Sequence, residues 1–281
     1  MYLVTGATGN AGRAVVRALV DSGEQVRAVV RPGSAAGRLD GVDVAEGDLN
    51  RPQTLREHMA GVRAAFLLSG YDGLAEMLAL LRRAGAERVV LLSSSAAPGG
   101  DLTNAIARYH ILPERAVLAS GLAWTFLRPN SFMTNTLRWL PQLREGDVIR
   151  VPFADVAIAT IDPADIGAVA VTAMVGDGLD GRSLRLSGPQ ALRPAEQAEI
   201  LGEALGRSLR VVGQTNEEAR AEMSATMPSE YVDAFFDFFA DGAIDETTVL
   251  PTVGEVLGRE PRRFEQWVAE NVGAFGGRPA R

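Results

Sequence analysis

Three glycines near the start of the sequence, Gly6, Gly9 and Gly12, recur at every third position within TGATGNAG. An apolar segment precedes them and a helical pattern follows, and at such a strand–loop–helix junction the backbone N–H groups and the helix dipole attract an anion. In a dinucleotide site the first glycine permits the turn, the second admits the pyrophosphate and the third lets the helix pack against the strand. We therefore interpret the loop as a dinucleotide-binding site, with a plain turn as the alternative. The other cofactor contacts expected in it are Thr8, Asn10 and Ala11.

The end of the next apolar segment indicates which dinucleotide binds. VRAVVRPGS places Arg31 there, and no carboxylate lies between Glu24 and Asp40. An NAD site usually carries an Asp or Glu near this point, whereas a guanidinium suits a 2′-phosphate. The sequence therefore predicts NADP(H) as the cofactor, with a solvated surface arginine as the alternative. Farther on, Asp48 and Leu49 are expected beside the adenine, although Asp48 could instead cap the helix that follows.

The apolar pattern of the first half predicts the elements that position these residues. Short apolar runs alternate with helical periodicity, which is typical of the α/β class and of a Rossmann-type, doubly wound parallel sheet. The strands are expected at Tyr2–Thr5, Gln25–Val30, Val42–Ala45, Ala64–Leu68, Arg88–Leu92 and Trp124–Leu127, and the helices at 11–22, 52–59, 72–84 and 103–119. Ligands bind at the carboxyl ends of such strands. The residues expected there, at the nicotinamide end, are Ser69, Gly70, Tyr71, Pro129 and Asn130.

The pattern loosens from about Leu137 and predicts a smaller lobe. GDVIRVPFADVAIATID indicates two short strands, PADIGAVAVTAMV a helix, RSLRLSG a strand and PAEQAEILGEALG another helix. We therefore expect residues 1–140 to form an NAD(P)-binding Rossmann domain. Residues 141–281 are expected to form mainly a mixed α/β, substrate-binding lobe, across a boundary that the chain crosses more than once.

Composition excludes several classes of function. The 281 residues carry 28 Lys plus Arg against 35 Asp plus Glu, a net charge of −7, and no basic run marks a nucleic-acid partner. The absence of cysteine excludes disulfides and sulfur-ligated metals, and we expect no metal site. No apolar stretch is long enough to span a bilayer, so we expect a cytoplasmic protein without a membrane partner. The oligomeric state stays open, and a homo-oligomer is compatible with the sequence.

Taken together, these motifs resemble the NmrA-like branch of the atypical short-chain dehydrogenase/reductase superfamily. The matching stretches cover nearly the whole chain: LVTGATGNAGR, VRAVVR, GDL, VVLLSSS, ASGLAWTFLRPNSFMTN, DPADIGAVAV and VLGREPRRFEQWVAEN. The resemblance implies an NADPH-dependent oxidoreductase that reduces quinones, azo or triphenylmethane dyes or related carbonyl compounds. It also implies an alternative, a non-catalytic protein that binds NADP(H) and regulates a partner according to the redox state.

The resemblance further implies a Ser at the end of the fifth strand and a Tyr-xxx-Lys pair whose Lys lowers the pKa of the Tyr. Ser95 is the best match to the serine. Tyr109 is followed four residues later by Pro113, and the other register places Ile106 and His110 at the two positions. The pair is therefore missing on either register. This favours a quinone-like or conjugated aromatic acceptor, in which the charge left by hydride transfer is delocalised.

Three readings of His110 remain at this point: a proton donor, a contact to a ribose hydroxyl, or an ordinary polar residue on a half-exposed helix. Tyr109 could donate the proton instead. Pro113 is expected to start a new helical segment or to kink the helix.

An aromatic stretch, SEYVDAFFDFFADG, predicts a helix whose apolar arc is too wide for a narrow stripe. One interpretation is a helix that docks the small lobe onto the sheet. The other is an aromatic pocket wall for a planar substrate, completed by Phe132, Met133 and Trp139.

Overall fold

A seven-stranded parallel sheet forms the larger part of the protein. The computed structural model describes residues 1–33 and 41–277. The strand order is β3-β2-β1-β4-β5-β6-β8, so the direction of winding reverses between β1 and β4. The strands are β1 (Tyr2–Val4), β2 (Val26–Val30), β3 (Asp43–Glu46), β4 (Ala64–Leu68), β5 (Arg88–Leu92), β6 (Ala123–Pro129) and β8 (Arg182–Leu186). This arrangement confirms the doubly wound fold, and its ligand crevice lies at the reversal point.

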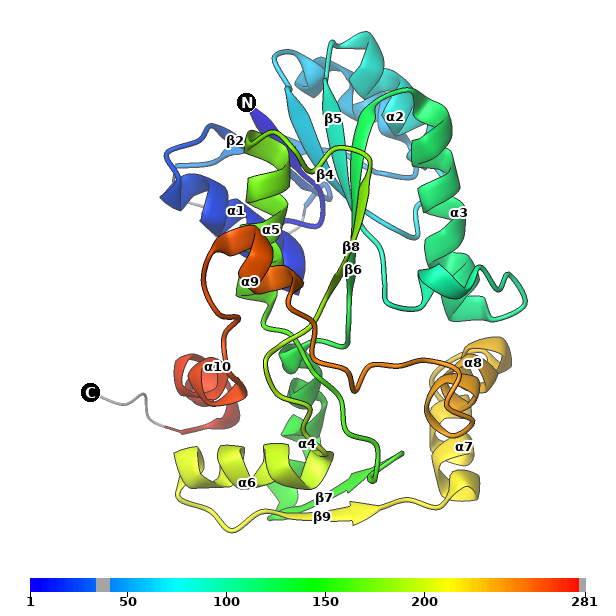
Figure 1. Cartoon of the computed structure of the whole chain (residues 1–281), viewed down its shortest axis with the longest axis vertical. Coiled ribbons are helices and arrows are strands. Elements are labelled where there is room, and N and C mark those ends of the chain that lie inside the picture. The colour runs from blue at the N-terminus through cyan, green and yellow to red at the C-terminus, as the bar shows by residue number, and fades with distance from the viewer. Residues whose placement is uncertain (34–40, 278–281) are drawn as a thin grey trace.

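Helices cover both faces of the sheet because successive strand residues point to opposite sides. In β1, Tyr2 and Val4 join the apolar cluster under α1 (Asn10–Asp21) and α5 (Pro163–Val175), whereas Leu3 joins the cluster on the other side. That second cluster packs under η1 (Pro52–Met59), α2 (Leu74–Arg83) and α3 (Ala105–Ser120). Figure 1 shows α1 and α5 on one side of the strands and α2 and α3 on the other.

The smaller lobe lies beyond the carboxyl ends of the strands (Figure 1). It contains a parallel pair of strands, β7 (Val148–Val151) and β9 (Arg210–Gly213), and an apolar core centred on Trp139, Phe264 and Trp267. The remaining helical elements after β6 are η3 (Met133–Trp139), α4 (Leu140–Glu145), α6 (Pro194–Leu205), α7 (Asn216–Ser224), α8 (Ser229–Phe239), α9 (Thr252–Leu257), α10 (Phe264–Asn271) and η4 (Val272–Phe275). Between β7 and α6 the chain returns to the large sheet, where α5 packs on α1 and β8 pairs with β6.

Three local expectations need correction. The stretch after β7 forms a turn and isolated bridges rather than a second strand, and β9 was not expected. The segment 52–59 is a 3₁₀ helix rather than an α-helix. Pro113 does not start a new helix, because α3 runs through it and buries Ile111 and Val117 on either side. Packing of these flanking residues outweighs the local cost of the proline.

The aromatic helix α8 docks on α3 and not on the sheet. Phe238 packs in one cluster with Ala107 and Ile111 of α3, and Phe236 contacts Phe153 edge-on with ring centroids 5.1 Å apart. Met133 and Trp139 are buried in or beside the core of the small lobe rather than lining a pocket with α8. Within the described residues, no helix is long and apolar enough to cross a membrane.

Candidate functional site

The glycine loop between β1 and α1 has the geometry that its spacing predicted. Gly6 adopts φ +62°, and its carbonyl accepts a hydrogen bond of 2.8 Å from the Gly9 N–H. A Cβ on Gly12 would lie 2.2 Å from the Gly6 carbonyl oxygen, so only glycine lets α1 approach the loop. A Cβ on Gly9, in contrast, would meet a single atom, the same oxygen at 3.3 Å. Gly12 therefore serves packing, and Gly9 keeps space free beside the loop.

The first turn of α1 leaves its backbone donors available. Gly9 is the N-cap residue and has no side chain, and no acidic residue lies in the first turn. N–H groups at such a helix start bind an anion when no side chain caps them. This open cradle and its free donors fit the pyrophosphate of a dinucleotide.

A hollow of about 600 Å³ adjoins the loop. Thr8, Gly9 and Asn10 line it together with Arg13, and the Asn10 amide donates to the Thr134 hydroxyl across it at 3.1 Å. Ala11 is buried against the sheet, so only its backbone can contact a ligand.

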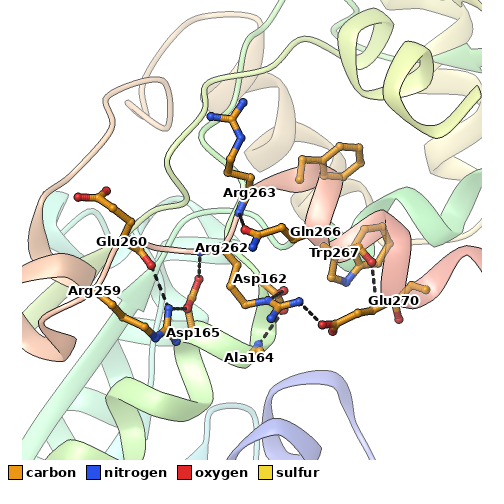
Figure 2. Close-up of polar contacts among 12 residues, drawn as sticks. Asp162, Ala164, Asp165, Arg259, Glu260, Arg262, Arg263, Gln266, Trp267 and Glu270 are labelled. Carbon is orange, nitrogen blue, oxygen red and sulfur yellow. Dashed lines mark hydrogen bonds and ion pairs between the residues drawn. The ribbon is translucent and has the colours of Figure 1, made fainter. Parts of the chain in front are cut away.

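The far wall of this hollow is an ion-pair network between α5 and the segment before α10 (Figure 2). Asp162 caps α5 by accepting from the Ala164 N–H at 2.8 Å, and its second oxygen binds Arg262 Nε at 2.7 Å. Asp165 accepts from the Arg262 backbone N–H at 2.7 Å and pairs with Arg259 at 2.8 Å. Burial raises the pKa of Asp165, and these donors oppose that rise. The network holds the C-terminal segment beside the glycine loop.

Residues expected at the adenosine end follow β2 and β3. Arg31 is exposed directly after β2. Asp48 does not cap the next helix, whose N-cap residue is Arg51, because its carboxylate closes its own turn by accepting from the Asn50 N–H at 2.9 Å. Leu49 lines a crevice of about 10 Å³ that also contains Thr5 and Tyr71.

Polar groups converge where β4 ends. The Tyr109 hydroxyl donates to the Ser69 carbonyl at 3.1 Å, and His110 Nδ1 lies 3.3 Å from the Ser69 hydroxyl. Gly70 has φ +89°, and a Cβ there would lie 1.9 Å from the Tyr109 hydroxyl oxygen. The structure thus brings Ser69, Gly70 and His110 together around Tyr109.

His110 is a neutral imidazole in this setting. Burial lowers its pKa to about 4, and Glu114 opposes the shift. The Ser69 hydroxyl donates its one proton to the Leu92 carbonyl at 3.2 Å. When both contacts form, the Ser69 oxygen must therefore accept a hydrogen bond from His110 Nδ1. This hydrogen-bond pattern assigns the proton to Nδ1 and leaves Nε2 as an acceptor. At neutral pH a ring in this state accepts a hydrogen bond at Nε2 and carries no imidazolium proton to supply.

Ser95 belongs to a hydrogen-bond group separate from that of Ser69, Tyr109 and His110. Its hydroxyl donates to buried Glu246 at 2.5 Å, and its N–H bonds to the Pro129 carbonyl at 3.0 Å. Glu246 also accepts from the Ser131 N–H and hydroxyl, the latter at 2.7 Å. Asn130 donates to the Glu246 carbonyl at 3.1 Å. Glu246 was missed because nothing in its local sequence, DETT, distinguishes it and its partner Ser95 is 151 positions away.

No described contact joins Ser95 to His110, so the two expected catalytic residues belong to separate hydrogen-bond groups in the part of the chain that the structure describes. The sequence also contains no lysine, since all 28 of its basic residues are arginines. That count excludes a Tyr-xxx-Lys pair directly. Among residues 1–33 and 41–277, no group of His, Cys, Asp and Glu could hold a metal ion.

Comparison with known proteins identifies the family and the fold of this chain. A family model described as NAD(P)H-binding matches residues 6–175. The chain is 37% identical to a (4-alkanoyl-5-oxo-2,5-dihydrofuran-3-yl)methyl phosphate reductase of Streptomyces griseus, and the match covers 98% of this chain and 99% of the relative. It is 35% identical to an NAD(P)H azoreductase of Xenophilus azovorans, with the same coverage of each chain. A solved NADPH-dependent quinone oxidoreductase of Escherichia coli has a TM-score of 0.79 at 22% identity over 97% of this chain and 100% of that one, which shows the shared fold.

Proposed function

The chain belongs to the NAD(P)H-binding, NmrA-like branch of the atypical short-chain dehydrogenases/reductases, and from this membership we propose the reaction that it catalyses. It is an NAD(P)H-dependent reductase. We propose that the hydride acceptor is a quinone-like or aromatic carbonyl compound, or another conjugated small molecule. The two relatives support this class, since one is a reductase of a (4-alkanoyl-5-oxo-2,5-dihydrofuran-3-yl)methyl phosphate and the other is an azoreductase.

The residues that would hold NADP(H) follow the strand ends in order. Gly6, Gly9 and the first-turn amides of α1 would bind the pyrophosphate, and Arg31 would bind the 2′-phosphate. The remaining proposed contacts are Thr8, Asn10, Ala11, Gly12, Asp48, Leu49, Ser69, Gly70 and Pro129. The cofactor, when bound, supplies the hydride.

The observation that carries the substrate class is the lack of an activated proton donor. His110 is neutral at neutral pH, and the Tyr109 hydroxyl has a raised pKa because of burial and of the neighbouring tyrosines Tyr71 and Tyr231. No lysine is present to lower the Tyr109 pKa. Acceptors whose negative charge is delocalised need the least help from an acid, so water can complete their protonation.

We assign His110 to positioning rather than proton donation. Its Nε2 would accept a hydrogen bond from a ribose hydroxyl, because Nδ1–H is used by Ser69. Ser95 stays our proposed donor to a developing oxyanion, which requires its hydroxyl to turn away from Glu246. Residues 141–281 would supply substrate contacts together with residues at the strand ends of the Rossmann domain.

Turnover of quinones tests the proposal. Purified protein with NADPH and a panel of benzoquinones, naphthoquinones and simple aliphatic ketones is followed at the NADPH absorbance band. We expect oxidation of NADPH with the quinones and little with the ketones. Tight NADPH binding without turnover of any acceptor would contradict the proposed reaction and favour the alternative, a redox-sensing protein that binds NADP(H).

A further inference from the structure

A groove rich in tyrosine lies beside Gly70, outside the glycine loop and its hollow. It encloses about 460 Å³ between the loop after β4, the helices α2 and α3, and the start of α8. Three tyrosines from three separate segments line it, with apolar side chains of α3 between them. We call this set the tyrosine groove; its principal residues are Tyr71, Tyr109, Tyr231, Leu112, Pro113 and Ala116.

The walls of the tyrosine groove are fixed by specific contacts. The Tyr109 ring packs over Gly70, where any Cβ would collide with its hydroxyl, and the same hydroxyl donates to the Ser69 carbonyl. Arg108 of α3 pairs with Glu230 of α8 at 2.6 Å, which joins α3 to the start of α8, where Tyr231 lines the groove. These contacts order part of the lining before a ligand binds, which reduces the side-chain entropy lost on binding.

The tyrosine groove also leaves apolar surface uncovered. Leu112 is 50% exposed and Tyr109 is 41% exposed. Arg108 is neutralised by Glu230, so Asp72 is the one remaining charge on the described lining. An uncharged, flat ring matches this lining better than an anion, because tyrosine faces and edges favour aromatic contacts.

We propose that the tyrosine groove is a binding site for the uncharged aromatic ring system of the substrate. The identity of that ligand rests on the proposed function, whereas the existence of the groove rests on the residues that line it. Gly70, which follows Ser69 just after β4, lines the groove, so a ring held there would lie beside the carboxyl end of that strand. Acceptors with an extended ring system would bind more tightly than single-ring acceptors of the same reactivity.

Direct binding of menadione tests the tyrosine groove without turnover. Menadione is titrated calorimetrically into the protein saturated with NADP⁺, which cannot reduce it. We expect Tyr231→Ala to weaken binding by roughly 10-fold, because one aromatic contact is lost. Leu112→Ser should weaken it by about 3-fold. The matched control is Leu118→Ser, since Leu118 lies on the same helix, is 53% exposed and does not line the groove.

The outcomes separate the groove from the reaction. Thermal unfolding of each variant confirms that it is folded. Equal affinity of the parent, Tyr231→Ala and Leu118→Ser proteins would overturn the groove, even if the parent reduces menadione. Groove-dependent binding without reduction would support the groove and overturn the proposed reaction. A dimer that Leu112→Ser dissociates, with menadione affinity unchanged, would show instead that a second copy of the chain covers this face and would overturn the proposal.

Discussion

Replacement of His110 should remove the acid sensitivity that this imidazole gives to folding between pH 6.5 and 4. The ring has an ordinary pKa of 6.5 in the unfolded chain, and burial lowers its pKa to about 4 in the folded protein. Between these values the unfolded state binds the extra proton, so the free energy of unfolding falls as the pH falls. The contribution of His110 is fully present above pH 6.5 and is lost by pH 4.

The size of the effect follows from the shift. Each pKa unit corresponds to about 1.4 kcal/mol, so the change across the window is about 3 kcal/mol. The assay is urea unfolding of the parent and of His110→Gln at several pH values between 4 and 7. We expect the stability difference between the two proteins to change by that amount, with a slope of at most about 1.4 kcal/mol per pH unit. Other titrating groups, including Asp165, cancel in this difference.

His58 provides the matched control because it is the second of the two histidines in the sequence. The same unfolding series on His58→Gln shows whether a change in pH dependence is specific to His110 or follows from removing either histidine. A parent and a His110→Gln variant with parallel stability profiles would refute the assignment of a buried neutral imidazole. An NADPH oxidation rate that depends on a group with a pKa near 6.5, and loses that dependence in His110→Gln, would refute its positioning role.

The other predictions concern the loop, the cofactor and the buried carboxylate. Arg31→Ala should remove a preference for NADP(H) over NAD(H) of about 10- to 100-fold, measured by calorimetric titration, and equal affinities in the parent would contradict it. Gly9→Ala should stay folded and lose cofactor affinity, whereas Gly12→Ala should lower the free energy of unfolding in urea by about 1–3 kcal/mol. The reversed pattern would exclude a binding role for Gly9 and a packing role for Gly12. Ser95→Ala should lower the free energy of unfolding by about 1–3 kcal/mol, because buried Glu246 loses a hydrogen-bond donor. It should slow turnover by at most about 10²-fold. Unchanged stability would show that the Ser95–Glu246 hydrogen bond does not stabilise the fold.

The sequence predicted the glycine loop and the large sheet well because their determinants are local. The roles of Gly6 and Gly12 follow from one turn and one helix contact within seven residues. The strands β4 and β5 were predicted to the residue, since a buried parallel strand is a continuous apolar run with clear ends. At the sheet edge, the predicted bounds of β3 began and ended one residue before the observed ones. Val44 in this strand is 41% exposed, so an apolar residue there does not indicate a buried position.

The rest depends on contacts between distant positions. Ser95 was assigned from its place after β5, but its partner Glu246 comes from the loop after α8 and has no pattern of its own. The strand β9 has only four half-exposed or exposed residues, too few for a period-two signal. Proline rules predicted a new helical segment or a kink at Pro113, and α3 runs through this residue as one helix.

The return of α5 and β8 to the large sheet has a mechanical consequence. The chain enters the small lobe after β6, leaves it to add α5 and β8, and enters it again at α6, so several separate segments connect the two parts. The network of Asp162 and Arg262 ties the last segment back as well (Figure 2). Hinge closure concentrates its rotation in a few linking residues, and here every link would have to rotate together. Single-hinge closure is therefore disfavoured, and a ligand that filled the hollow between Asn10 and Thr134 would have to separate the side chains that bond across it.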